Sequence, residues 1–152
     1  MRFSLLLFLP VLAACAPRPA AVEGRAPDPQ AETAVSEALA APPPPVAARS
    51  VEEFDTTSAA QRAAAADPAS GGTLLGETVA SLGDPSRPGF WMETPLVKEE
   101  RPGRLEYPAN GKSVEVALLP VEGGSSRVSL AALRLLEAPL TGLPMLKVFR
   151  LE

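Results

Sequence analysis

The chemistry open to this chain is narrow, because its 152 residues include no histidine and a single cysteine. These absences exclude Ser-His-Asp and Cys-His catalysis, histidine-ligated metal sites and an internal disulfide. The remaining candidates for acid chemistry are carboxylates. Glu122 is the candidate acid, although it is more simply interpreted as a solvated loop residue. Asp84 is likewise more simply interpreted as a turn residue than as a catalytic one. We therefore expect no catalytic residue, no metal and no cofactor.

A second kind of chemistry is the stacking of an aromatic face on a sugar ring. Trp91 is the only tryptophan and Tyr107 the only tyrosine, and with Phe90 they are candidates for such a platform. The alternative is that these rings fill the core. Three cations could pair with carboxylates of a peptide stem: Arg104, Lys112 and Arg127. The alternative is that they are merely scattered over the surface.

The single cysteine lies where modification would place it at a membrane. Arg2 is followed by an apolar run, residues 3–11, and then by Leu12-Ala13-Ala14-Cys15. A charged start, a short apolar stretch and small residues are the layout of a secretory signal, and the run is too short to span a bilayer. Leu-Ala-Ala-Cys resembles the lipobox of bacterial lipoproteins, which implies cleavage before Cys15 and its lipidation. Ala16 after the cysteine implies, by the same resemblance, the periplasmic face of the outer membrane.

Composition divides the rest of the chain. Residues 1–14 are the expected signal peptide, and residues 15–50, rich in alanine and proline, the expected disordered tether. In residues 51–71 two capping boxes and an alanine run predict a short helix at 58–66. Residues 72–152 are the expected folded domain. The net charge of −4 argues against nucleic acid as a partner.

The folded domain has the pattern of strands. Residues 73–82, 90–97 and 145–151 are expected strands, with a helix over 129–138. Residues 104–109 and 113–119 alternate apolar and polar side chains on either side of Asn110-Gly111, the strongest two-residue hairpin signal. Pro108 indicates that the first of these strands lies at an edge or ends there.

Two of these segments resemble the rare lipoprotein A family, whose fold is a double-psi β-barrel. Asn110-Gly111-Lys112-Ser113-Val114 is similar to the family's hairpin, and the residues from Ser129 to Leu136 to its helix; Leu146 to Phe149 take the place of its final strand. The resemblance implies a mainly β fold, a small six-stranded double-psi-like barrel with one helix, and an envelope location. It implies peptidoglycan as the ligand.

The departures from that family concern its activity. Members that cleave glycan strands use the aspartate of a DRGP loop, and Pro120 stands at that place here. Glycan cleavage needs an acid to protonate the leaving oxygen, which proline cannot do. We therefore expect a lipid-anchored, non-catalytic protein that binds peptidoglycan or an envelope partner through Trp91, Tyr107, Arg127 and Glu122. The alternatives are a divergent lytic transglycosylase and an accessory subunit of an envelope complex.

A second resemblance carries less information about function. Phe54-Asp55-Thr56-Thr57 and the stretches 61–66, 78–85 and 88–97 are similar to small alphaproteobacterial envelope proteins that carry a D-galactarate dehydratase label. Such dehydratases are far longer and use a metal. With no histidine and no thiol beyond Cys15, this chain has poor ligands for iron.

Overall fold

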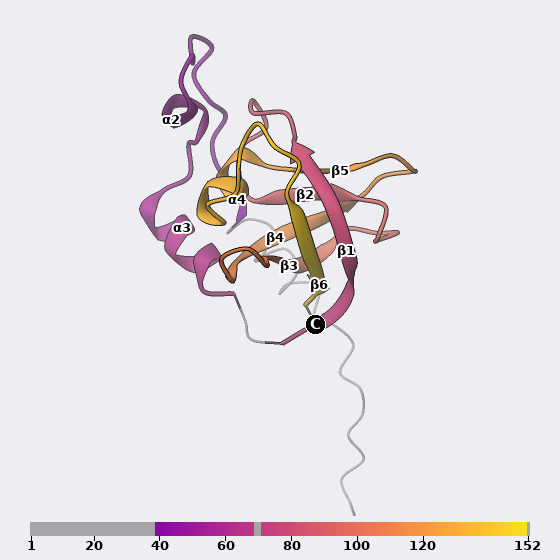
Figure 1. The fold of residues 1–152 in the computed structure, drawn as a ribbon. Helices are drawn as coiled ribbons and strands as arrows, with labels where there is room; N and C mark the ends of the chain where they lie inside the picture. The colour runs from indigo at the N-terminus through magenta and orange to yellow at the C-terminus, as the bar shows by residue number, and fades with distance from the viewer. Residues whose placement is uncertain (1–38, 69–70, 152) are drawn as a thin grey trace, which may run out of the picture.

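The computed structural model describes residues 39–68 and 71–151, so the expected signal peptide, Cys15 and most of the tether lie outside the described residues. The described chain is a closed six-stranded barrel with one short helix between its last two strands, preceded by a segment with two further helices (Figure 1). This confirms the fold class expected from the sequence. The elements are α2 (Val51–Phe54), α3 (Ala59–Ala66), β1 (Thr73–Leu82), β2 (Trp91–Thr94), β3 (Arg101–Tyr107), β4 (Lys112–Pro120), β5 (Ser126–Val128), α4 (Leu130–Leu135) and β6 (Met145–Arg150).

The strands follow one another around the barrel in the order β1-β5-β2-β4-β3-β6, and β6 closes the ring on β1. The pairs β1·β5 and β2·β4 are parallel, and the other four pairs are antiparallel. Closure leaves no unpaired strand edge. Each strand therefore has its partners within residues 73–150.

The hairpin of β3 and β4 is present, but its turn is not the one that Asn-Gly predicts. Tyr107 pairs with Lys112, so four residues form the loop. The amide N–H of Asn110 donates to the Tyr107 carbonyl over 3.2 Å. Pro108, whose fixed φ suits the second position of a type I turn, starts this loop and ends β3. Of the four loop residues, only Gly111 takes the left-handed conformation, at φ +72°.

The core fills the barrel and the space beneath α4. On β4 the side chains of Val114, Val116 and Leu118 are buried and alternate with half-buried ones, as the sequence pattern predicts. Leu146 and Val148 do the same on β6. From α4 and its C-terminus, Leu133 and Leu136 complete the cluster. Ser129 caps this helix by accepting a hydrogen bond from the N–H of Ala132.

Residues 39–68, which we call the strap, lie against one side of the barrel beside α4 (Figure 1). The expected tether extended to residue 50, yet Leu39 is only 7% exposed and its carbonyl accepts the N–H of Phe90 over 2.9 Å. Gly89 makes this approach possible: a Cβ there would lie 2.4 Å from the Leu39 carbonyl oxygen. Leu39, at the start of the described part of that segment, is therefore packed on the barrel, whereas Val46 further along is fully exposed.

Both helices of the strap begin at the predicted capping boxes. Ser50 with Glu53 caps α2, and Ser58 with Gln61 caps α3. The alanine-rich α3, for which the sequence predicts only weak packing, packs against β4 and buries Ala65 to 2% exposure. Within the described residues, no helix has the length and apolar character needed to cross a membrane.

Candidate binding site at one end of the barrel

A pocket of about 450 Å³ opens where β3 ends and β6 begins. Tyr107, half-buried, is its only aromatic side chain, and the rest of the lining is mainly apolar. Leu143 and Met145 expose 69% and 53% of their surface at its rim. The lining residues are Tyr107, Pro108, Ala109, Pro139, Leu143, Pro144 and Met145.

Strand pairing brings these distant residues together. Glu106 pairs with Lys147, so the end of β3 lies beside the start of β6. On the other side of β6, Met145 pairs with Val79 of β1, which is also exposed. The Pro144 carbonyl accepts the N–H of Ala80 over 3.0 Å. The floor of the pocket is therefore fixed by the barrel itself.

The hairpin loop that forms one wall is fastened to the end of α4. The side-chain amide of Asn110 donates to the Leu136 carbonyl over 2.8 Å. Lys112 Nζ lies 2.6 Å from Glu137 Oε1. Glu137 has a φ of +50°, the only positive φ among the described non-glycine residues. Two bonds and one unusual backbone conformation thus hold the wall in place.

Glu137 takes this conformation because the chain leaves α4 through a Schellman motif. The N–H of Ala138 donates to the Leu133 carbonyl over 3.0 Å, and the N–H of Glu137 donates to the Arg134 carbonyl over 3.1 Å. These bonds satisfy carbonyls at the helix end that have no partner within the helix. The residue at this position is usually glycine, and glutamate here instead supplies a partner for Lys112.

Trp91, the first candidate for a sugar platform, lies inside the protein. Trp91 is only 5% exposed, and its indole N–H donates to the Arg87 carbonyl over 3.1 Å. The Arg87 guanidinium lies 4.6 Å from the ring centroid. Gly83 packs so close to the ring that a Cβ would lie 2.4 Å from it. The ring is therefore packed rather than open, and Tyr107 is the candidate aromatic that borders a pocket.

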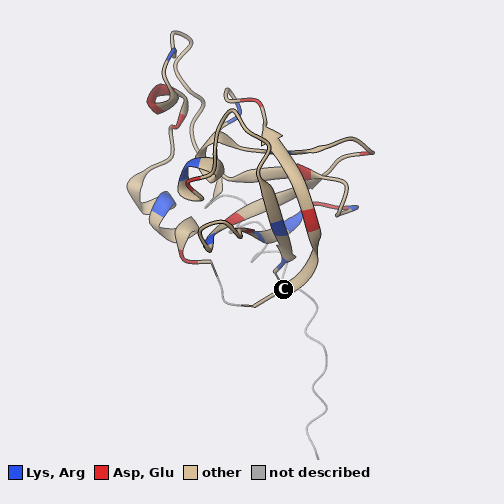
Figure 2. Ribbon diagram, viewed as in Figure 1, with Lys and Arg blue, Asp and Glu red and all other residues tan. Residues whose placement is uncertain are grey.

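The candidate cations lie on the barrel surface and are paired. Arg127 pairs with Glu93 across β5 and β2 at 3.3 Å, and Arg87 bonds the same carboxylate at 3.0 Å. Arg104 is 3.2 Å from Glu106 and stacks on Phe149 at 3.9 Å from the ring centroid. Charges of both signs are interspersed on the ribbon in Figure 2. Neither Arg127 nor Arg104 lines the Tyr107 pocket.

The candidate acids are also dispersed. Glu122 is exposed in the β4–β5 loop, which projects on the side opposite the strap (Figure 1). Hydrogen bonds from Ser86 lower the pKa of Asp84. Burial raises the pKa of Glu115, which occupies an outward position between the buried Val114 and Val116 of β4. Pro120 ends β4, paired with Thr94.

Of the pocket residues, only Tyr107 was a site candidate from the sequence; the other six are Pro108, Ala109, Pro139, Leu143, Pro144 and Met145. Prolines after a helix indicate only where the helix ends, and a leucine or methionine in a sequence is expected to lie in the core. Leu143 and Met145 are marked instead by the exposure of their apolar side chains, which only the fold reveals. Within residues 39–68 and 71–151, no group of three or more acidic or cysteine side chains is placed to hold a metal ion.

Comparison with known proteins gives no relative for this chain: it matches no protein-family model, no curated protein and no solved structure.

Proposed function

We propose that this protein is a lipid-anchored, non-catalytic binding module of the bacterial envelope, held at the outer membrane through Cys15. Its binding site is the Tyr107 pocket, and its ligand is peptidoglycan or a segment of an envelope protein. The lipobox-like sequence before Cys15 is the basis of the location. The observation that carries the binding role is the exposed apolar lining beside an accessible tyrosine ring.

The organisation of the pocket supports binding. A monomeric protein usually covers its large apolar side chains, and an apolar patch rimmed by polar groups is typical of an interaction site. Leu143 and Met145 are more than half exposed, with the Lys112–Glu137 ion pair beside the same hairpin. Because the Asn110 bond and that ion pair hold the hairpin wall, little conformational freedom is lost when a ligand enters.

The alternative of glycan cleavage has less support. A transglycosylase needs a proton donor directed at the scissile bond. Glu122 stands on an exposed loop and does not line the Tyr107 pocket, and Glu115, with its raised pKa, lies on the outer face of β4. The other alternative, an accessory subunit of an envelope complex, uses the same pocket. It is equivalent to our proposal if the ligand is a segment of an envelope protein.

The test uses the full chain in detergent, sedimented with intact peptidoglycan sacculi, followed by analysis of pellet and supernatant. Tyr107→Ala and Leu143→Ser are the variants, and Arg127→Gln, which is exposed and outside the pocket, is the matched control. Co-sedimentation that both pocket variants weaken and the control retains supports peptidoglycan as the ligand. If the protein stays in the supernatant, covalent cross-linking at position 143 in cells identifies a protein ligand. Release of muropeptides would refute the proposal. So would a protein that neither co-sediments with sacculi nor cross-links to any protein in cells.

A further inference from the structure

One buried carboxylate of the strap pairs with a cation of the barrel. The side chain of Asp55 is 2% exposed, and its Oδ2 lies 2.7 Å from Nη1 of Arg134 on α4. Its other oxygen accepts hydrogen bonds from the backbone and the hydroxyl of Thr57, at 3.3 and 2.5 Å. Arg134 is the only barrel residue in this set. The ion pair is therefore the polar attachment between the two parts at this point.

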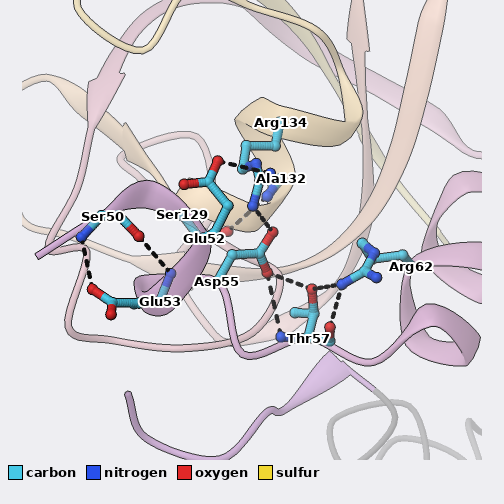
Figure 3. A network of polar contacts seen from close by, with 9 residues as sticks. All are labelled: Ser50, Glu52, Glu53, Asp55, Thr57, Arg62, Ser129, Ala132 and Arg134. Carbon is cyan, nitrogen blue, oxygen red and sulfur yellow. Dashed lines mark hydrogen bonds and ion pairs between the residues drawn. The ribbon is translucent and has the colours of Figure 1, made fainter. Parts of the chain in front are cut away.

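Figure 3 shows how the surrounding groups lie. The Arg134 guanidinium is directed at Asp55 and toward Glu52, whose carboxylate is 3.7 Å away and 74% exposed. Arg62, from α3, bonds to the carbonyl and hydroxyl of Thr57 on the far side. Glu52, Asp55, Arg62, Arg134 and Leu135 border a polar pocket of about 430 Å³. Water thus reaches the attachment, although Asp55 itself is covered.

Away from Arg134, the strap contacts the barrel through one backbone hydrogen bond and through buried apolar side chains. Leu39 is buried and reaches the N–H of Phe90 through its carbonyl, over the gap left by Gly89. Ala65 is the buried residue of α3. Other polar contacts, such as Gln61 to the Ala40 carbonyl, join the strap to itself. The strap therefore holds its own shape, and it adds Leu39 and Ala65 to the apolar core of the barrel.

The strands of the barrel do not need the strap for their pairing, although the N–H of Phe90 donates to the Leu39 carbonyl. All six strands pair within residues 73–150, and α4 is capped by Ser129. Displacing the strap breaks no strand pair, but it uncovers Arg134 and the apolar surface around Phe90 that Leu39 occupies. The uncovered groove would present a cation beside an apolar site and the close approach at Gly89.

We propose that the strap is a displaceable cover, latched by Asp55 and Arg134, over a groove that binds an acidic helical segment of a partner protein in the strap's place. The segment supplies a carboxylate to Arg134, an apolar side chain to the Leu39 site and small residues against β4, because the groove already holds a segment with that chemistry. None of the groove residues named here lines the Tyr107 pocket. This proposal therefore stands apart from the ligand assigned to that pocket.

Hydrogen exchange of the full chain tests the latch. Asp55→Asn keeps the shape and removes the charge, and we expect amides of α2 and α3 to exchange about 10- to 100-fold faster together, since a hydrogen bond to a charged group is lost. Amides of β3, β4 and β6 should keep their rates. Glu52→Gln, whose carboxylate is exposed and more distant from Arg134, is the matched control and should change little. Arg134→Gln should repeat the effect of Asp55→Asn. Acceleration of the strands in parallel with the strap, or no acceleration of the strap, would overturn the proposal.

A labelled synthetic peptide of residues 39–68 tests the groove. It should bind the Asp55→Asn chain more tightly than the wild-type chain, because the chain's own strap competes less. A peptide that carries the same Asp55→Asn change should bind both chains weakly. Equal binding of the two peptides, or none by the wild-type peptide to the opened chain, would show that no segment is recognised there in trans. Unchanged results with Tyr107→Ala would separate this groove from the binding pocket.

Discussion

Glu137 allows the cost of holding the pocket wall to be measured. Its φ of +50° is one that a residue with a Cβ adopts at a cost of about 1–2 kcal/mol. Glutamate also offers Lys112 a partner at 2.6 Å. Substitution by glycine relieves the backbone and removes the ion pair, whereas substitution by glutamine removes the charge and keeps the backbone cost. The pair of variants therefore separates the two effects.

The expected magnitudes follow from exposure and conformation. The side chains of Lys112 and Glu137 are 44% and 64% exposed, so their ion pair contributes about 0–1 kcal/mol. Glycine lowers the free-energy cost of the left-handed conformation. Its greater freedom in the unfolded chain offsets about 0.5–1 kcal/mol of that gain in stability. We expect Glu137→Gly to unfold with a free energy about 0.5–1 kcal/mol higher than Glu137→Gln. Relative to the wild type, Glu137→Gln should lose less than about 1 kcal/mol.

Urea unfolding followed by tryptophan fluorescence measures this difference, because the indole of Trp91 is packed in the core and reports its opening. The slope of the unfolding free energy against urea should be the same for the three proteins, since the surface exposed on unfolding is unchanged. Repetition at high salt should shrink the difference between the wild type and Glu137→Gln. If Glu137→Gly is no more stable than Glu137→Gln, the backbone cost at residue 137 does not exceed the entropy that glycine adds to the unfolded chain, and the argument for a strained wall is wrong.

Three further substitutions have outcomes set by the fold. Gly83→Ala should lower the free energy of unfolding by about 1–3 kcal/mol, measured by urea titration, because its Cβ would lie 2.4 Å from the buried ring of Trp91. Glu115→Gln should raise the melting temperature at pH 7. Burial raises the pKa of Glu115 above its ordinary value of 4.5, so its charged form costs stability once the pH passes that value, and the gain should vanish as acidification protonates the wild-type carboxyl. Leu105→Ala, in the buried core, should lower the free energy of unfolding by about 2–5 kcal/mol. Leu143→Ala, at a residue that is 69% exposed, should change it by less than about 0.5 kcal/mol.

The core of the barrel could be predicted because alternation along a strand is local. Val114, Val116 and Leu118 follow one another at every second position, and one face of a β-strand is buried when they do. Capping is equally local, and Ser58 with Gln61 marks the start of α3 within four residues. These features require nothing from the rest of the chain.

The strap and the hairpin loop depend on contacts that short patterns do not encode. An alanine helix has no apolar stripe of large residues, so its docking depends on how closely its backbone approaches β4, and the Leu39 contact depends on Gly89, 50 residues further along the chain. In the hairpin, Asn110-Gly111 is a valid turn sequence, yet Pro108 ends the strand first and sets a longer loop. In both places one residue type constrains backbone geometry more strongly than the motif does.

The candidate site follows the same physical rule, because closure of the barrel creates it. Tyr107 and Met145 lie 38 positions apart in the sequence, and they meet because β3 and β6 pair antiparallel and β6 closes the ring on β1. Any register shift of β6 by one residue would exchange its faces, burying Met145 and exposing Leu146. The pocket thus depends on the register that buries Leu146 and Val148, which are fully covered. A substitution that loosens the β6 core, such as Val148→Ala, should therefore weaken ligand binding at Tyr107 and lower the free energy of unfolding, whereas Leu143→Ser should weaken binding at constant stability.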